Sequence, residues 1–242
     1  MKFLVALFLL VSQVFANPVL QFSQTKTQYT LDFNSCPMKS SGDLAILLAK
    51  EFDNSKSLYK LKKKIIDERY KEIYFLSNYQ VHYNPIVKKL AFKFECPGLI
   101  AKIQITKENG VSFLGSLVDT GDVFDPQYEV LLRREKLIAQ SVPYFAISIK
   151  NLNEQKHIGV VSLLKQMNPK IYQQVSEVIL NDSDELTLIL KSKSKATSVL
   201  LGKEYWDDKI SKLLKIQDHF SQKEKKPLVI NLTSNKKVVV RF

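Results

Sequence analysis

The side chains best suited to acid–base or metal chemistry near neutral pH are the histidines, and the sequence keeps its three histidines apart. His82, His157 and His219 stand neither beside a nucleophile motif nor at the spacing of metal ligands. With only seven glycines, the chain has no phosphate-binding loop and no dinucleotide fingerprint, and a serine-hydrolase elbow is also absent. We therefore expect no catalytic residue, metal, cofactor or small-molecule substrate.

Two acidic clusters could carry chemistry, yet each has a simpler structural interpretation. Asp207 and Asp208 form a carboxylate pair near the start of a predicted helix, where negative charge is favoured by the helix dipole. Asp182, Asp184 and Glu185 lack the full spacing of a calcium loop, and no glycine follows them. We interpret the first pair as helix-start residues and the second group as turn residues.

The charge of the chain favours anionic partners in general. It has 36 basic and 24 acidic residues, a formal net charge of +12, and nearly all of the basic residues are lysine. Such a field attracts nucleic acid or an anionic membrane surface. Lysine cannot supply the bidentate fork with which arginine reads bases, however, and the lysines are scattered in short clusters. We interpret them as solvated faces and expect no nucleic-acid partner.

The first sixteen residues, MKFLVALFLLVSQVFA, have the pattern of a secretory signal. Lys2 precedes an apolar run, and Val14 and Ala16 stand where a signal peptidase reads small residues. The run is short for a membrane span, although an uncleaved anchor that extends to Leu20 is the alternative. In both cases we expect the remainder of the chain to be exported to the outer face of the cytoplasmic membrane or the periplasm.

The two cysteines, Cys36 and Cys96, leave two alternatives open. An even count in an exported chain is compatible with a disulfide, and two free buried cysteines are equally compatible with the sequence. A metal site is disfavoured, because the cysteines are far apart and no histidine is near them. A bridge requires Cα atoms within about 7 Å, which depends on the fold.

The first half of the chain predicts a small two-layer unit. Alternating apolar residues at 28–33 indicate a strand, and Ser40 and Ser41 precede a helical pattern as its expected cap. A second helix is predicted from Leu58 to Leu76, with Ile73 on its apolar face. Two alternating strands follow at 79–83 and 90–94. The order strand, helix, helix, strand, strand places two helices against one face of a small sheet.

The second half predicts a larger sheet with helices. Strands are expected at 99–105, 111–118, 144–149, 175–180, 186–190, 197–201, 228–232 and 238–242. One helix is expected at 157–167, with Ile158, Val161 and Leu164 facing inward, and another begins near Trp206. The polar residues at 181–184 indicate a hairpin. The chain is therefore predicted to be an α+β protein.

Several phrases, taken in order, resemble the FtsQ/DivIB cell-division family. LAFKFECPGLIA at 90–101 resembles the family's third POTRA strand and its exit, with Glu95 and Pro97 in the corresponding places. LVDTGDVF at 117–124 is similar to the family's entry into its β domain, through Asp119, Gly121, Val123 and Phe124. Residues 185–202 and 229–242 resemble two later strands, a glycine and the terminal hairpin. The resemblance covers about residues 25 to 242.

The resemblance implies a non-catalytic division scaffold with two extracytoplasmic domains. Residues 1–16 would be the signal peptide or short anchor, residues 20–98 a βααββ POTRA-like domain, and residues 99–242 the FtsQ-type β domain. The expected fold is α+β, with the POTRA-like unit followed by a meandering mixed sheet that has helices on one side. A POTRA-bearing secretion or assembly factor, or another envelope adaptor, is the alternative.

The resemblance also implies a binding site, because the family's terminal strand receives a short strand that follows a coiled-coil partner of the FtsB/FtsL type. The corresponding residues here are Lys237, Val238, Val239, Val240, Arg241 and Phe242. The alternative is a strand that only closes the sheet. Two departures bear on this site: Asn181 and Asp182 occupy a hairpin where some members carry arginines, and an aromatic residue of the terminal hairpin is replaced near Ser234.

Overall fold

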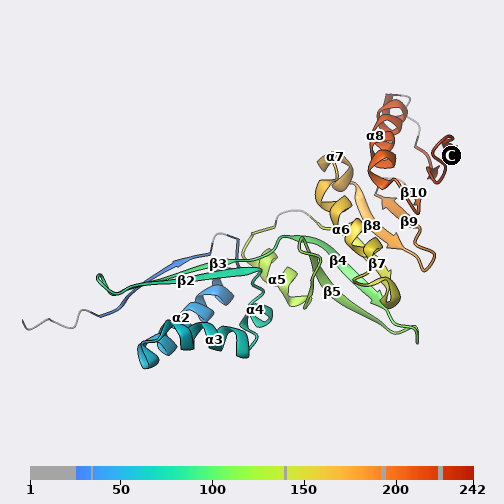
Figure 1. Ribbon diagram of the computed structural model, residues 1–242. Helices are drawn as coiled ribbons and strands as arrows, with labels where there is room; N and C mark the ends of the chain where they lie inside the picture. Colours follow the sequence, from blue (N-terminus) through green and yellow to red (C-terminus); the bar gives the residue numbers. More distant parts are fainter. Residues whose placement is uncertain (1–25, 34, 139–140, 192–194, 223–225) are drawn as a thin grey trace, which may run out of the picture.

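The computed structural model describes residues 26–33, 35–138, 141–191, 195–222 and 226–242 (Figure 1). The expected signal or anchor at residues 1–16 lies outside these ranges. Among the helices that are described, none is long and apolar enough to span a bilayer. The described chain forms a three-stranded sheet and a nine-stranded sheet, each with its own helices and core.

The small sheet is formed by three strands in the order β1-β3-β2. Strand β3 lies in the middle, parallel to β1 and antiparallel to β2. Three helices pack against the sheet around a core of leucine, isoleucine and phenylalanine side chains. The elements are β1 (Gln28–Asp32), α2 (Met38–Ser55), α3 (Leu58–Asp67), α4 (Tyr70–Ile73), β2 (Asn78–Asn84) and β3 (Lys89–Glu95).

Two helix boundaries differ from the sequence prediction. Helix α2 begins at Met38, so Ser40 and Ser41 lie inside its first turn, where both hydroxyls donate to the Pro37 carbonyl and cap nothing. The single helix expected from residue 58 to 76 is broken at Arg69, whose φ of 53° is left-handed and cannot continue an α-helix. As a result Ile73, expected on the apolar face, is 58% exposed.

The structure joins Cys36 and Cys96 in a disulfide that ties the loop before α2 to the end of β3. Their Cα atoms lie 4.9 Å apart, and both residues belong to the core of the small unit. The backbone N–H of Cys96 also donates to the Ser35 hydroxyl at 3.0 Å. The bridge therefore closes the small unit at the end where the chain passes into the large sheet.

The large sheet is mixed, in the order β12-β11-β10-β9-β8-β7-β4-β5-β6. Its parallel pairs are β4 with β7, β7 with β8, and β10 with β11. The strands are β4 (Leu99–Thr106), β5 (Ser112–Val118), β6 (Val123–Phe124), β7 (Tyr144–Ser148), β8 (Val175–Leu180), β9 (Leu186–Leu190), β10 (Thr197–Gly202), β11 (Val229–Asn231) and β12 (Val239–Arg241).

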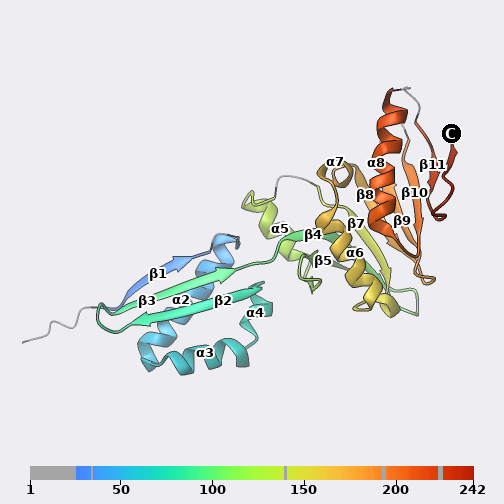
Figure 2. The same ribbon diagram turned by 45° about the horizontal axis from the view of Figure 1, so that its top comes forward.

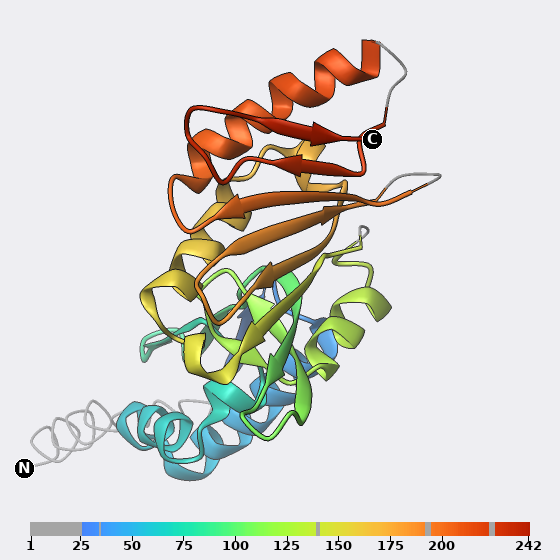
Figure 3. The same ribbon diagram turned by 90° about the vertical axis from the view of Figure 1, so that its right-hand side faces the viewer.

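Helices α6 (Gln155–Gln166), α7 (Pro169–Tyr172) and α8 (Trp206–Gln222) cover one face of this sheet and share its main core. A short helix, α5 (Gln127–Arg134), lies on the other side near β5 (Figure 3). Its Tyr128 packs with Val118, whose neighbour Leu117 faces the main core. The expected inward position of Ile158 is wrong: it is 61% exposed, because α6 turns His157, Val160, Val161, Leu163 and Leu164 inward.

The two units meet around α5. The Tyr128 hydroxyl donates to the Pro97 carbonyl at 2.6 Å, and its ring lies 4.9 Å from that of Phe75. The Glu135 carboxylate accepts from the backbone N–H groups of Met38 and Lys39 at the start of α2. Aromatic packing and charge-assisted hydrogen bonds therefore join the small unit to the large sheet.

The phrase that suggested entry into the β domain forms the turn between β5 and β6. Gly121 has a φ of 91°, a conformation that glycine adopts without strain, and its N–H donates to the Val118 carbonyl at 2.9 Å. Asp119 donates its N–H to Gly98 at 2.8 Å. This turn therefore fixes the start of the large sheet against the end of the small one.

Candidate protein-binding edge

Strand β12 forms one edge of the large sheet. It pairs antiparallel with β11, with Val239 opposite Asn231 and Arg241 opposite Val229. Within the described part of the chain, no strand lies on its other side. An edge strand presents backbone N–H and C=O groups that a strand from another chain can pair with.

The side chains of β12 alternate between the helix-covered face and the open face. Val240 is opposite Ile230, a buried residue of the main core, so it faces α8. Val239 is 61% exposed on the other face, and Arg241 is exposed as well. The edge therefore combines accessible backbone with an exposed β-branched side chain and a positive charge.

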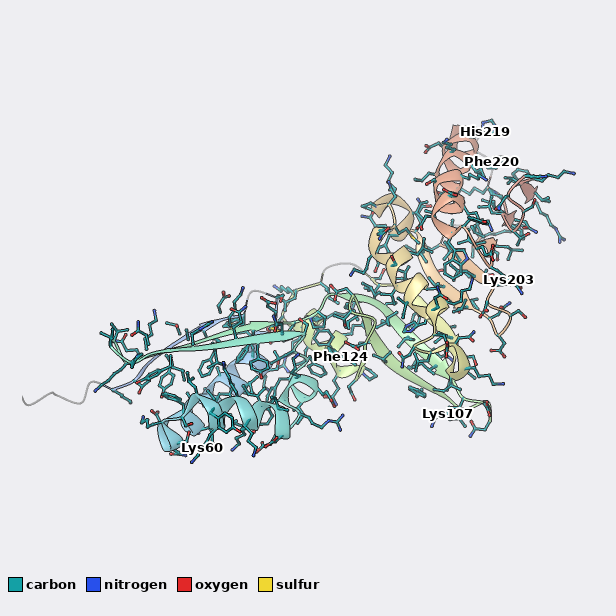
Figure 4. The ribbon with its side chains drawn as sticks, in the orientation of Figure 1. Lys60, Lys107, Phe124, Lys203, His219 and Phe220 are labelled. Carbon is teal, nitrogen blue, oxygen red and sulfur yellow. A yellow bond between two sulfur atoms is a disulfide. The ribbon has the colours of Figure 1, made fainter. Side chains whose placement is uncertain are left out.

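The last residue, Phe242, is positioned by helix α8. Its ring makes an edge-to-face contact with that of Phe220, and the ring centroids are 5.4 Å apart. Phe220, which is labelled in Figure 4, lies near the C-terminal end of α8. Half of Phe242 remains exposed, at 56%. Phe242 therefore extends an apolar surface from the helix to the edge strand, just beyond the last residue of β12.

A buried lysine on α8 holds the turn that leads to β12. Lys209 is only 3% exposed, and its Nζ donates to the carbonyl oxygens of Leu201 at 2.7 Å and Thr233 at 3.4 Å. One helical turn later, Lys212 Nζ donates to the carbonyl oxygen of Asn235 at 3.1 Å. Burial lowers the pKa of Lys209. Lys209 and Lys212 thus bind the carbonyl groups of Thr233 and Asn235 in the β11–β12 connection.

The sequence reasoning missed Lys209, although a signal for its burial was present. It lies three residues after Trp206 and four before Leu213, and both of those are core residues of α8. A lysine at this spacing must lie on the apolar face of the helix. Its long aliphatic stem lets the ammonium reach backbone acceptors while the stem stays among apolar side chains.

The turn itself is closed by short polar side chains. Asn231 Oδ1 accepts from the N–H of Thr233 at 2.9 Å, and Ser234 Oγ accepts from the N–H groups of Lys236 and Lys237 at 3.3 and 3.4 Å. Ser234, which stands where an aromatic residue was expected from the resemblance, therefore has a local structural role. The turn delivers Lys236 and Lys237 to the start of the edge strand.

The charge along this edge is positive. Lys236, Lys237 and Arg241 are exposed, and no ion pair joins them to a carboxylate anywhere in the described ranges. Unpaired surface cations leave a field that attracts acidic groups, and the attraction weakens with salt.

The Asn181 hairpin lies away from this edge and has an internal role. Strands β9, β10 and β11 separate β12 from β8, which leads into the hairpin. Asn181 Oδ1 accepts from the N–H groups of Ser183 at 3.0 Å and Glu185 at 2.8 Å. These residues therefore form a turn, as the sequence indicated.

The carboxylate pair on α8 and the buried histidine of α6 also have structural roles. Asp207 and Asp208 occupy the first turn of α8, as predicted. His157 is 1% exposed, stacks on Phe145 and accepts from the Asn153 N–H through Nδ1 at 3.1 Å. Burial lowers its pKa, so the ring is neutral. Among the described residues, no group of three or more histidine, cysteine or acidic side chains could hold a metal.

Comparison with known proteins gives one family. The model described as "Cell division protein FtsQ/DivIB, C-terminal" matches residues 111–233, about half of the chain. The match runs from the start of β5 through β11 and stops before β12. No curated protein matches the sequence.

Proposed function

The chain belongs to the FtsQ/DivIB family of cell-division proteins, and we propose that it is a non-catalytic scaffold that binds other division proteins through strand β12. The observation that carries this proposal is the position of β12 at the edge of the large sheet, held at its turn by Lys209 and Lys212. A rigidly held edge loses little conformational entropy when a partner strand binds.

The proposed mechanism is strand addition. A partner strand would pair with the outer backbone groups of β12, and backbone hydrogen bonds would supply affinity. Val239 on the open face and Phe242 beside Phe220 would contact alternate partner side chains, which supplies selectivity. The partner class is the short strand after a coiled-coil division protein of the FtsB/FtsL type, with acidic residues favoured by Lys237 and Arg241.

The proposed setting is the outer face of the cytoplasmic membrane. Residues 1–16 would act as a signal peptide or short anchor, residues 20–98 as a POTRA-like domain, and residues 99–242 as the FtsQ-type β domain. The order of the small unit, a strand, two helices with a short third one, and two strands, supports the second assignment, and the family match supports the third. Sequencing of the mature N-terminus would give Asn17 for a cleaved signal and Met1 for a membrane-held anchor. Recovery of the intact chain as a soluble cytoplasmic protein would contradict both.

The experiment that tests the scaffold is partner capture with and without the terminal strand. Full-length chain and a variant lacking residues 237–242 are used to capture division proteins from solubilised membranes. We expect the deletion to abolish capture of the coiled-coil partner. Capture that is unchanged by the deletion would return β12 to a purely structural role and favour the alternative, an envelope adaptor that binds through the small unit.

A further inference from the structure

The turn between β2 and β3 presents two exposed apolar side chains at the tip of the small sheet. In the four-residue turn 85–88, Ile86 is 91% exposed and Val87 is 56% exposed. Exposed turns are normally made of small and polar residues. Adjacent large apolar side chains at a protruding tip are therefore a feature that packing within the described part of the chain does not explain.

Two backbone N–H groups of the tip already have a hydrogen-bond partner. Asn84 Oδ1 accepts hydrogen bonds from the backbone N–H groups of Ile86 and Val87, at 3.0 and 3.4 Å. An apolar surrounding penalises backbone N–H groups that lack a partner. Because Asn84 supplies that partner for both N–H groups, moving them out of water costs less free energy.

Positive charge surrounds the apolar pair. Lys88 and Lys89 follow it directly, and Lys26 is exposed beside the same tip, since Gln28 is opposite Lys89. None of these lysines forms an ion pair with a carboxylate in the described residues. Asp53, whose carboxylate interacts with Lys26, is itself paired with Lys56 at 2.7 Å.

The described chain also begins at this tip. Strand β1 starts level with the β2–β3 turn, and Gln28 donates its N–H to the Lys88 carbonyl at 2.9 Å (Figure 2). The 25 preceding residues, with their apolar run, therefore join the molecule here. From Leu20 to Lys26 an extended chain spans at most roughly 20 Å. If the apolar run is held in a membrane, the tip must lie close to that membrane.

We propose that the β2–β3 tip is a lipid-contact site. Ile86 and Val87 enter the interfacial layer of an anionic bilayer, and Lys26, Lys88 and Lys89 contact lipid phosphates. Apolar insertion and electrostatic attraction to anionic lipid add in such sites. The contact holds the small unit close to the bilayer and limits its rotation about the N-terminal segment. This inference rests on the membrane setting of the proposed function and is independent of partner binding at β12.

The test places a tryptophan at the tip of the full-length chain. The single native tryptophan, Trp206, is only 9% exposed, so the unsubstituted chain supplies the fluorescence baseline. Ile86→Trp is compared with Val111→Trp, in which residue 111 is 56% exposed next to the β4–β5 turn. That turn carries Lys107, which Figure 4 shows at the opposite end of the molecule from the β2–β3 tip. Both chains are reconstituted into phosphatidylglycerol vesicles that contain brominated lipid, and circular dichroism controls for folding.

We expect the emission of Ile86→Trp to shift to the blue and to be quenched by bromine at least about twofold more than that of Val111→Trp. The excess should be lost in phosphatidylcholine vesicles and reduced in K88Q/K89Q, because the lysines favour anionic lipid. Vesicle-bound chain whose residue 86 is quenched no more than residue 111 would overturn the tip contact while leaving membrane association intact. A chain that does not associate with vesicles would overturn both. Partner capture, measured separately, reports only on β12.

Discussion

The ring of Phe242 packs edge-to-face on the ring of Phe220, which ties the last residue of the chain to helix α8. Together with the lysine contacts at the preceding turn, it fixes both ends of β12 to the same helix. A strand of three residues, with one neighbouring strand in the described ranges, has little stability of its own. The helix therefore determines whether this edge is ordered enough to bind another chain.

The sharpest test of strand addition is a backbone change at Val239. Val239→Pro removes a backbone donor, and proline fits poorly in a paired ladder, so capture of the coiled-coil partner should be abolished. Val239→Thr keeps the β-branched shape and every backbone donor and should change capture little. Pull-down of division proteins measures both, with circular dichroism as the folding control. A folded Val239→Pro variant with undiminished capture would place the interface elsewhere.

Charge reversal at Arg241 should weaken binding modestly. Arg241 is exposed at the end of β12, where its charge would attract an acidic partner through solvent. The loss in Arg241→Glu should be greater at low salt than at high salt, because ions screen exposed charges over about 10 Å at 0.1 M. Affinity measured across a salt series checks this. A salt-independent loss would indicate a packing role for the side chain.

The buried Lys209 should contribute more to the free energy of unfolding than the exposed Lys212 does. In Lys209→Met the stem is kept but two carbonyl groups lose their donor, one of them deeply placed at Leu201, so the free energy of unfolding should fall by about 1–3 kcal/mol. Lys212→Met removes one exposed contact and should change it by less than about 0.5 kcal/mol. Denaturant unfolding measures both variants. Equal losses of unfolding free energy in the two variants would show that the buried contacts of Lys209 stabilise the fold no more than the exposed contact of Lys212.

Reduction of the Cys36–Cys96 bridge should destabilise the small unit. The cross-link closes a loop with a sequence separation of 60, for which the chain-entropy model gives about 4 kcal/mol. Unfolding of native chain with and without reductant measures the loss, and a C36S/C96S variant should behave as the reduced chain does. Alkylation of unfolded, unreduced protein provides the direct check: two reactive thiols would refute the bridge.

His157 should make the fold sensitive to mild acid. Its pKa is lowered from 6.5 by burial, so as pH falls below about 6.5 the unfolded chain binds a proton that the folded chain resists. The stability that the neutral ring contributes is therefore complete above pH 6.5 and is lost progressively below it. His157→Phe keeps the stacking on Phe145 but cannot titrate, so its unfolding free energy should change less between pH 7.5 and 5.5. An identical pH dependence in both chains would assign the effect to other groups.

The sequence by itself determined most of the strands and the longer helices in their order, although not α5, α7 or β6. Alternation at 90–94 and 186–190 gave strands whose apolar residues are buried, and the polar residues at 181–184 gave the hairpin that the structure contains. The phrase from Asp119 to Phe124 indicated the family, which the match to residues 111–233 confirms. These features depend on neighbours within a few residues, because periodicity and turn chemistry are properties of local backbone geometry.

The tertiary structure alone decided which distant segments meet. The parallel pairing of β1 with β3 brings Gln28 beside Lys89, and this places the start of the described chain at the apolar tip. The position of β12 at a sheet edge, the burial of Lys209 under Thr233 and the approach of Cys36 to Cys96 depend on the same kind of long-range contact. Residue spacing cannot specify these contacts, because their free energy comes from packing between elements and from the entropy of closing long loops.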